Sequence, residues 1–170
     1  TFTTEVLINA SGLNAHNLSE KLGFNHKQYY CKGDYFSVHN GKNKLVSRLI
    51  YPLVKKNSHG LGIHITLGLD GRMRLGPDSN YVDEINYKVD ENKRKLYYEF
   101  VKPFFPALEL EDLQPEISGI RPKLQGPKDN FKDFYIREDL PWFINLLGIE
   151  SPGLTASLAI AKYVREILFN

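Results

Sequence analysis

The sequence predicts an α+β fold, in which a strand and helix of the α/β type are followed by antiparallel or mixed sheet and by a carboxy-terminal helix. Three observations support this prediction. An apolar run at residues 5–9 leads through small residues into a helical pattern at 14–22. Two later stretches carry Asn-Gly or Asp-Gly between sheet-forming segments, as β-hairpins do. Residues 151–170 space apolar side chains at helical intervals.

The amino-terminal segment predicts a strand, a tight turn and a helix. Residues 5–9 read EVLIN without alternation, which is typical of a parallel strand covered on both faces. Ala10, Ser11 and Gly12 are small enough for the backbone to approach another group closely. A helix follows at 14–22.

The next segment predicts antiparallel sheet from residue 29 to about residue 77. Residues 29–39 and 45–51 are rich in aromatic and β-branched side chains and flank Asn40-Gly41. Between residues 63 and 75, apolar and polar side chains alternate around the turn Asp70-Gly71. We therefore expect two hairpins.

The second half predicts two helices and three short strands. A helix follows Asp90, with Leu96, Phe100 and Val101 as its inner stripe and the charged run 91–95 on its solvated face. The last helix begins at Ser151 as N-cap, with Pro152 in the first helical position. The strands are expected at residues 117–124, 133–137 and 142–147.

The composition limits the classes of partner. The 170 residues carry 22 Lys and Arg against 20 Asp and Glu, and a net charge of +2 does not favour nucleic acid or an acidic membrane. No apolar run reaches the length of about 18 residues needed for a membrane span. The single cysteine, Cys31, forms no internal disulfide, which suits a reducing compartment such as the cytoplasm. The histidines show no metal-ligand spacing, so no metal is expected.

Glycine-rich phosphate loops such as G-x-G-x-x-G and G-x-x-x-x-G-K-[ST] are absent from the sequence. One segment nevertheless suits an anion or an electron-rich ligand edge. Residues 148–155 place small residues at a predicted helix start, where backbone N–H groups lack partners. An ordinary capped helix explains the same pattern. The only methionine is Met73, so we expect the chain to be part of a longer protein.

Six segments together resemble the D-amino-acid-oxidase-like superfamily of FAD-dependent oxidoreductases, most of all its branch acting on L-2-hydroxyglutarate. They are, in the family's order and spacing, LINASGLNAHNLSEKLG, KGDYF, LIYPL, GLGIHITLGLDGRMRLGPD, ISGIRPKL and GIESPGLTASLAIAKYV. The resemblance starts midway through the family's chain. It therefore implies that the partner of this chain is an amino-terminal FAD-binding portion, and that this chain alone binds FAD weakly.

The resemblance also implies a domain organisation and a cofactor site. Residues 1–28 and 116–170 would belong to the FAD domain, and residues 29–115 to the substrate domain. Asn9, Ala10, Ser11 and Gly12 would lie beside the nucleotide part of FAD, and Gly119 and Ile120 near the flavin. Ser151, Pro152, Gly153, Leu154 and Thr155 would lie against the pyrimidine edge of the flavin, where N–H groups stabilise negative charge.

The substrate implied by the resemblance is a small carboxylate, a 2-hydroxy acid, that transfers hydride to flavin. Arg121 would bind the carboxylate, although a structural salt bridge is the alternative. His64 would take the hydroxyl proton, unless it is a plain strand residue. Tyr35 and Tyr51, expected on adjacent strands, would line the pocket or pack as aromatics. Amine, amino-acid or glycerol-3-phosphate oxidation and a non-catalytic binding domain are the alternative functions.

Overall fold

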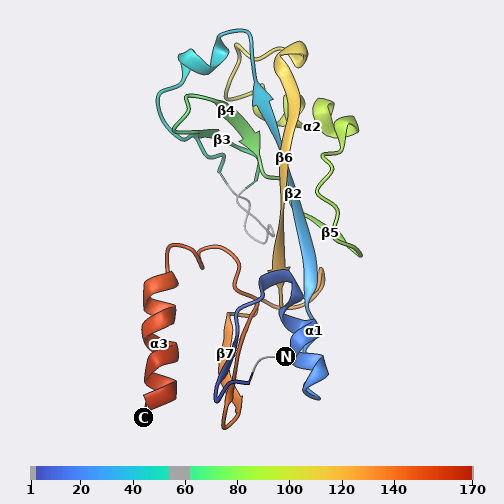
Figure 1. Ribbon diagram of the computed structural model, residues 1–170. Coiled ribbons are helices and arrows are strands. Elements are labelled where there is room, and N and C mark those ends of the chain that lie inside the picture. Colours follow the sequence, from blue (N-terminus) through green and yellow to red (C-terminus); the bar gives the residue numbers. More distant parts are fainter. Residues whose placement is uncertain (1–2, 54–61, 170) are drawn as a thin grey trace. The chain divides into compact units, whose positions relative to one another are not determined.

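The computed structural model describes residues 3–53 and 62–169, which form two compact units (Figure 1). The first unit comprises Thr1–Cys31, Tyr81–Glu84 and Arg121–Asn170, and the second comprises Lys32–Asn80 and Ile85–Ile120. Each unit is built from segments that lie far apart in the sequence. Both units combine helix with sheet, so the predicted α+β class is confirmed.

The first unit contains a three-stranded sheet with the order β1-β8-β7. β1 (Leu7–Asn9) runs parallel to β8 (Phe143–Leu147), and β7 (Tyr135–Leu140) runs antiparallel to β8. The central strand β8 is buried along its whole length, as its run of apolar side chains requires. The strands predicted at 133–137 and 142–147 are confirmed, and so is the parallel strand predicted at 5–9. The expectation that this parallel strand is covered on both faces is wrong, because Ile8 is 43% exposed.

Two helices complete the first unit. α1 (Ala15–Lys21) follows a 3₁₀ turn at Gly12–Asn14. α3 (Ser157–Phe169) buries Val164 against Leu146 of β8 and neighbouring apolar side chains. The prediction that this last helix begins at Ser151 is wrong. The N–H of Gly153 donates to the oxygen of Glu150 at 2.5 Å, so the backbone closes a tight turn there and the helix starts six residues later.

The second sheet has five strands, with the order β3-β4-β2-β5 and with β6 also paired to β2. Its elements are β2 (Tyr29–Val38), β3 (His64–Leu67), β4 (Met73–Gly76), β5 (Asn80–Val82) and β6 (Leu113–Lys123). β3 and β4 form the antiparallel hairpin predicted around Asp70-Gly71. Sequence analysis missed β5, which is only three residues long and so shows no alternating pattern.

The first predicted hairpin, around Asn40-Gly41, is wrong. The chain leaves β2 and enters a 3₁₀ helix at Lys42–Leu45 instead of returning along β2. Asp112 holds this departure in place, because its backbone oxygen accepts from the N–H of His39 and its carboxylate accepts from Asn40 at 2.8 Å. Residue Ile50 then bridges to Ile65 of β3, so the segment 45–51 lies beside β3 and not beside β2.

α2 (Arg94–Val101) follows a 3₁₀ turn at Glu91–Lys93 and covers the second sheet, but of its predicted inner stripe only Val101 is buried. Tyr97 and Val101 are fully buried, whereas Leu96 and Phe100 are exposed. The Tyr97 ring packs on Phe36 of β2 with ring centroids 4.6 Å apart, and its hydroxyl donates to the backbone oxygen of Asp34. These contacts turn the Tyr97 side of the helix inward.

The charged run 91–95 is not wholly solvated, since Lys93 enters a buried ion cluster. The Lys93 ammonium lies 2.6 Å from the carboxylate of Asp34 and 2.7 Å from that of Asp78. Asp34 is completely buried on β2, and its backbone N–H donates to Asp78. Lys93 therefore links α2 to the sheet through two carboxylates.

Candidate functional site

The turn that follows β1 brings small, exposed residues directly after Asn9, the one buried residue of that strand. Asn9 is buried, while Ala10 and Ser11 are exposed and Gly12 is half-buried. The Asn9 amide nitrogen donates to the oxygen of Ala15 and to the side-chain oxygen of Asn145, both at 2.7 Å. Asn9 therefore supports the turn from its buried side, and residues 10–12 form the exposed surface of the turn.

Gly12 makes this turn suitable for close approach by a ligand. Its φ of +59° is a conformation that side-chain-bearing residues rarely adopt, and a Cβ placed there would meet no atom within 4 Å. On the protein side, Gln28 donates its side-chain amide to the oxygens of Gly12 and Leu13. Gln28 thus holds the backbone of the turn on one side, while the space next to Gly12 is open on the other side. This arrangement fits the nucleotide part of a cofactor.

The loop before α3 offers backbone donors. Ser151, Pro152, Leu154 and Thr155 are exposed, and Gly153 is buried. A Cβ at Gly153 would lie 2.6 Å from Ile149, so the tight turn requires glycine. The N–H groups of Leu154 and Thr155 donate to no backbone oxygen among the described residues. Such donors fit the electron-rich edge of a flavin ring.

Three charged side chains gather beside this loop. Lys123, at the end of β6, lies 2.7 Å from Glu150, and both side chains are nearly buried. Arg121 lies 3.6 Å from the other oxygen of Glu150, and its side chain is 43% exposed. Because Lys123 makes the shorter contact, it neutralises most of the Glu150 charge. Arg121 keeps an exposed guanidinium that can bind a carboxylate while resting on Glu150.

Gly119 and Ile120 precede Arg121 on β6. Gly119 is exposed, and a Cβ there would meet no atom within 4 Å. Ile120 is half-buried. Their position leaves the backbone of this strand open to a ligand.

His64 is the first residue of β3 and is only 8% exposed. Its Nδ1 lies 3.0 Å from the backbone oxygen of Gly62, which can only accept. Nδ1 therefore carries the proton of the neutral ring, and Nε2 keeps a lone pair. This tautomer is the one that a general base acting through Nε2 requires.

Tyr51 stacks on His64, with ring centroids 4.3 Å apart and an interplanar angle of 23°. The prediction that Tyr51 and Tyr35 lie on adjacent strands is wrong. Tyr51 follows the bridge between Ile50 and β3, whereas Tyr35 lies on β2, and β4 runs between β2 and β3. The structure therefore brings Tyr51 against His64, and it places Tyr35 beside Gly76 of β4, which is the register partner of His64.

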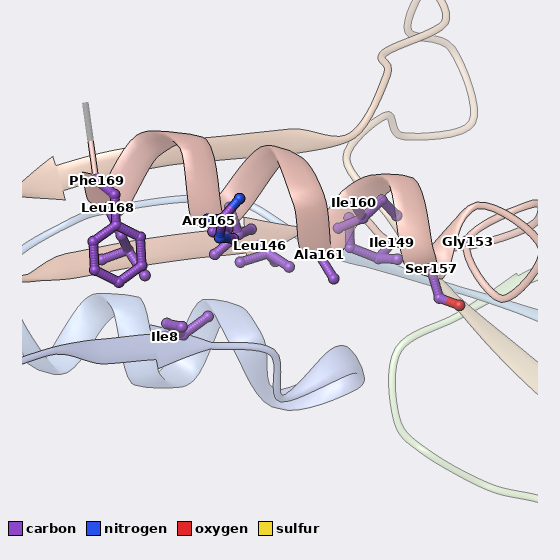
Figure 2. A pocket seen from close by; sticks show the side chains of 11 residues that line it. Ile8, Leu146, Ile149, Gly153, Ser157, Ile160, Ala161, Arg165, Leu168 and Phe169 are labelled. Carbon is purple, nitrogen blue, oxygen red and sulfur yellow. The ribbon is translucent and has the colours of Figure 1, made fainter.

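A groove of about 480 Å³ lies between α3 and the sheet of the first unit (Figure 2). Figure 2 shows Ile8 of β1 facing the side chains of α3, with Leu146 and Ile149 between them. Apart from Ser157 and Arg165 its lining is apolar. Such a surface lacks the converging polar groups that bind a small carboxylate.

Neither a metal site nor a membrane-spanning helix is found in residues 3–53 and 62–169. Within those ranges no group of three or more His, Cys, Asp or Glu could hold a metal ion. No helix there is long and apolar enough to cross a membrane.

Sequence analysis missed four polar residues that support the turn and the loop. They are Glu150 and Lys123 beside Arg121, and Asn145 and Asp139 behind Asn9. The signal for Asn145 was its position in the middle of the otherwise apolar run FINLL. A polar residue in a buried strand needs a hydrogen-bond partner.

Three comparisons relate the chain to known proteins. It is 35% identical to the mitochondrial L-2-hydroxyglutarate dehydrogenase of Arabidopsis thaliana, over 94% of this chain and 36% of that protein. It is 33% identical to the glycerol 3-phosphate oxidase of Mycoplasma genitalium, over 98% of this chain and 43% of that protein. The structure of L-alpha-glycerophosphate oxidase from Mycoplasma pneumoniae with FAD bound matches with a TM-score of 0.72 and 26% identity, covering 95% of this chain and 42% of that one.

The chain spans less than half the length of these relatives. A family model described as FAD dependent oxidoreductase, DAO, matches residues 1–167, which is nearly the whole sequence. The match agrees with the six segments that suggested the resemblance. The chain therefore belongs to the DAO family of FAD-dependent oxidoreductases.

Proposed function

We propose that this chain is the carboxy-terminal part of an FAD-dependent enzyme that oxidises a small 2-hydroxy acid of the L-2-hydroxyglutarate type. The observation that carries the proposal is the 3.0 Å contact between His64 Nδ1 and the oxygen of Gly62, because it leaves Nε2 as the ring nitrogen that would take the hydroxyl proton when the alcohol is oxidised. The 35% identity to a hydroxyglutarate dehydrogenase favours this substrate class. A cytoplasmic location stays a prediction, since that relative is named as mitochondrial.

FAD, when bound, supplies the hydride acceptor that converts the C–OH group into a carbonyl. Residues 10–12 would receive its nucleotide part, and the N–H groups of Leu154 and Thr155 would bind the pyrimidine edge. Gly119 and Ile120 would pass beside the ring. The family resemblance implies these roles, and the exposed backbone at Gly119, Leu154 and Thr155 supports them.

His64 and Arg121 have separate roles in this proposal. Nε2 of His64 takes the proton of the substrate hydroxyl, while Nδ1 stays anchored on Gly62. Tyr51 holds the imidazole plane by stacking. Arg121 binds the substrate carboxylate through its exposed guanidinium, with Glu150 supporting it from behind.

Glycerol 3-phosphate is the second candidate substrate. The observation in its favour is the 33% identity to the Mycoplasma genitalium oxidase, and a guanidinium binds phosphate as well as carboxylate. No contact described above specifically favours the amine substrates or a purely binding role. The predicted role of Tyr35 in lining the pocket stays a prediction.

One experiment tests the function and separates the two substrates. The full-length protein that contains this chain is expected to purify yellow with bound FAD. Under anaerobic conditions L-2-hydroxyglutarate should bleach the flavin absorption, and glycerol 3-phosphate should not. Bleaching by glycerol 3-phosphate alone would assign the second substrate, and a colourless protein that takes up no added FAD would contradict the proposed function.

Replacing Arg121 by Lys is expected to raise KM for the hydroxy acid and to lower kcat/KM roughly tenfold, since an ammonium loses one of two charged hydrogen bonds. Steady-state kinetics on the full-length protein measure both constants. The exposed Arg48→Lys serves as the matched control and should leave KM unchanged. Equal KM values for Arg121→Lys and the wild type would leave Arg121 as a structural partner of Glu150 only.

A further inference from the structure

A buried chain of hydrogen bonds runs beneath the turn at residues 9–12. Asn9 and Asn145 face each other in the register of β1 and β8 and are 1% and 0% exposed. The Ser11 hydroxyl donates to Asn9 Oδ1 at 2.6 Å, and Asn9 Nδ2 donates to Asn145 Oδ1 at 2.7 Å. Asn145 Nδ2 donates in turn to the carboxylate of Asp139. The chain therefore links Ser11 to Asp139 through two amides.

Asp139 determines the direction of this chain, because an ionised carboxylate only accepts hydrogen bonds. Asn145 must turn its NH₂ group toward Asp139, which leaves its oxygen for Asn9. Asn9 must then turn its NH₂ group toward Asn145, which leaves its own oxygen for Ser11. A reversed amide at either position would bring two donors or two acceptors together in a buried site, at a cost in free energy.

The Asp139 carboxylate is itself fixed by aromatic neighbours. The Tyr135 hydroxyl donates to its Oδ1 at 2.5 Å, and His26 Nε2 lies 3.4 Å from its Oδ2. Burial, together with the hydrogen bond to Asp139, raises the pKa of Tyr135 to about 12. The phenol therefore stays a donor at neutral pH, and the Asp139 end of the chain has one stable arrangement.

At the other end, the Asn9 oxygen shapes the turn. It accepts from the Ser11 hydroxyl and lies 3.4 Å from the Ser11 backbone nitrogen. The Asn9 amide nitrogen also ties the turn to the first residue of α1 through Ala15. A flipped Asn9 amide would turn a donor toward the Ser11 backbone N–H and an acceptor toward the oxygen of Ala15. Both contacts would be lost, and the open backbone at Gly12 would lose its support.

We propose that Asp139 is a positioning residue for the cofactor: through Asn145 and Asn9 it fixes the turn at residues 9–12 in the shape that receives the nucleotide part of FAD. This inference rests on the proposed function for the identity of the ligand. It assigns a role to a residue that lies on β7, away from the turn in sequence and two strands away in the sheet.

A double-mutant cycle in the full-length protein tests the proposal through FAD affinity. Asp139→Ala is expected to raise the Kd for FAD on the order of tenfold, and Ser11→Ala to raise it less. If the two residues act through one chain, the double variant should bind no more weakly than Asp139→Ala alone. Asp139→Asn keeps an oxygen that can accept from Asn145 and should restore most of the affinity. The exposed Asp133→Ala is the matched control and should bind FAD as the wild type does.

Additive effects in the cycle, or an unchanged Kd in Asp139→Ala, would overturn the proposal. Should Asp139→Ala fail to fold, Tyr135→Phe replaces it in the cycle and is judged by the same criterion, since it removes the donor that fixes the carboxylate.

Hydrogen exchange separates this inference from the proposed function. Without FAD, amides of residues 9–15 should exchange faster in Asp139→Ala than in the wild type, while amides of β4 should not change. Unchanged exchange at residues 9–15 overturns the positioning role even if FAD binds. A wild-type protein that binds no FAD contradicts the proposed function, and the exchange result still decides whether Asp139 holds the turn.

Discussion

Replacing His64 by Asn is expected to slow flavin reduction on the order of 100-fold while FAD stays bound and the fold stays intact. The structure makes Asn a selective replacement. Its amide nitrogen can occupy the place of Nδ1 and donate to the oxygen of Gly62, as the imidazole does at 3.0 Å. Only Nε2, the proposed base, is then missing.

Two further variants sharpen this test. His64→Gln reaches the place of Nε2 with an amide but cannot accept a proton, so it should be as slow as His64→Asn. Tyr51→Phe keeps the stacked ring and removes only the hydroxyl, so it should reduce flavin at nearly the wild-type rate. Rapid-mixing measurement of flavin bleaching gives all three rates. A wild-type rate in His64→Asn would show that the base lies elsewhere.

The elements that could be predicted are those whose signals are local. The hairpin of β3 and β4 has its turn residues, Asp70-Gly71, and its alternation within one short segment. The parallel pairing of β1 with β8 was visible only as an apolar run, because its partner lies far along the sequence. Asn40-Gly41 carried an equally good local signal for a hairpin, but β2 pairs with β4 and β6 instead of with the segment that follows the turn. The carboxylate of Asp112 accepts a hydrogen bond from Asn40 and so holds the chain away from β2.

The candidate site shows the same division. The open backbone at Gly12 and Gly119 follows from small residues that stand in the sequence itself. The partners of the polar side chains do not, since Asn9 and Asn145 are 136 positions apart and Lys123 and Glu150 are 27 apart. Long-range pairs of this kind depend on the register of the sheets, which composition and spacing do not fix.

Lys93 is the clearest case of a residue whose local pattern misleads, and its replacement should be strongly destabilising. It stands in a charged run, yet its ammonium is shared by the buried Asp34 and the nearly buried Asp78. Burial by itself would lower the pKa of Lys93, but the hydrogen bonds to Asp34 and Asp78 outweigh it and hold the pKa above 10.5. Lys93 therefore stays charged at neutral pH, and the stability that its ion pairs contribute is lost at alkaline pH, as the pH rises through this raised pKa.

Lys93→Met keeps the packing of the side-chain stem and leaves two carboxylates without their shared cation. Breaking a buried pair in this way costs about 3–5 kcal/mol. Lys32, 3.6 Å from Asp34, compensates part of the charge, so we expect a loss near the lower limit of that range. Thermal unfolding at neutral pH should show a Tm lower by roughly 10 °C.

The neighbouring Lys95 provides the matched control, because it stands in the same charged run and its side chain is 75% exposed. Lys95→Met should change the Tm little, since exposed ion pairs such as that with Glu99 contribute little to stability. Adding Asp34→Asn to Lys93→Met should recover part of the lost stability by removing the most deeply buried charge. Equal Tm values for Lys93→Met and Lys95→Met would mean that water, rather than Lys93, balances the charge of Asp34 and Asp78.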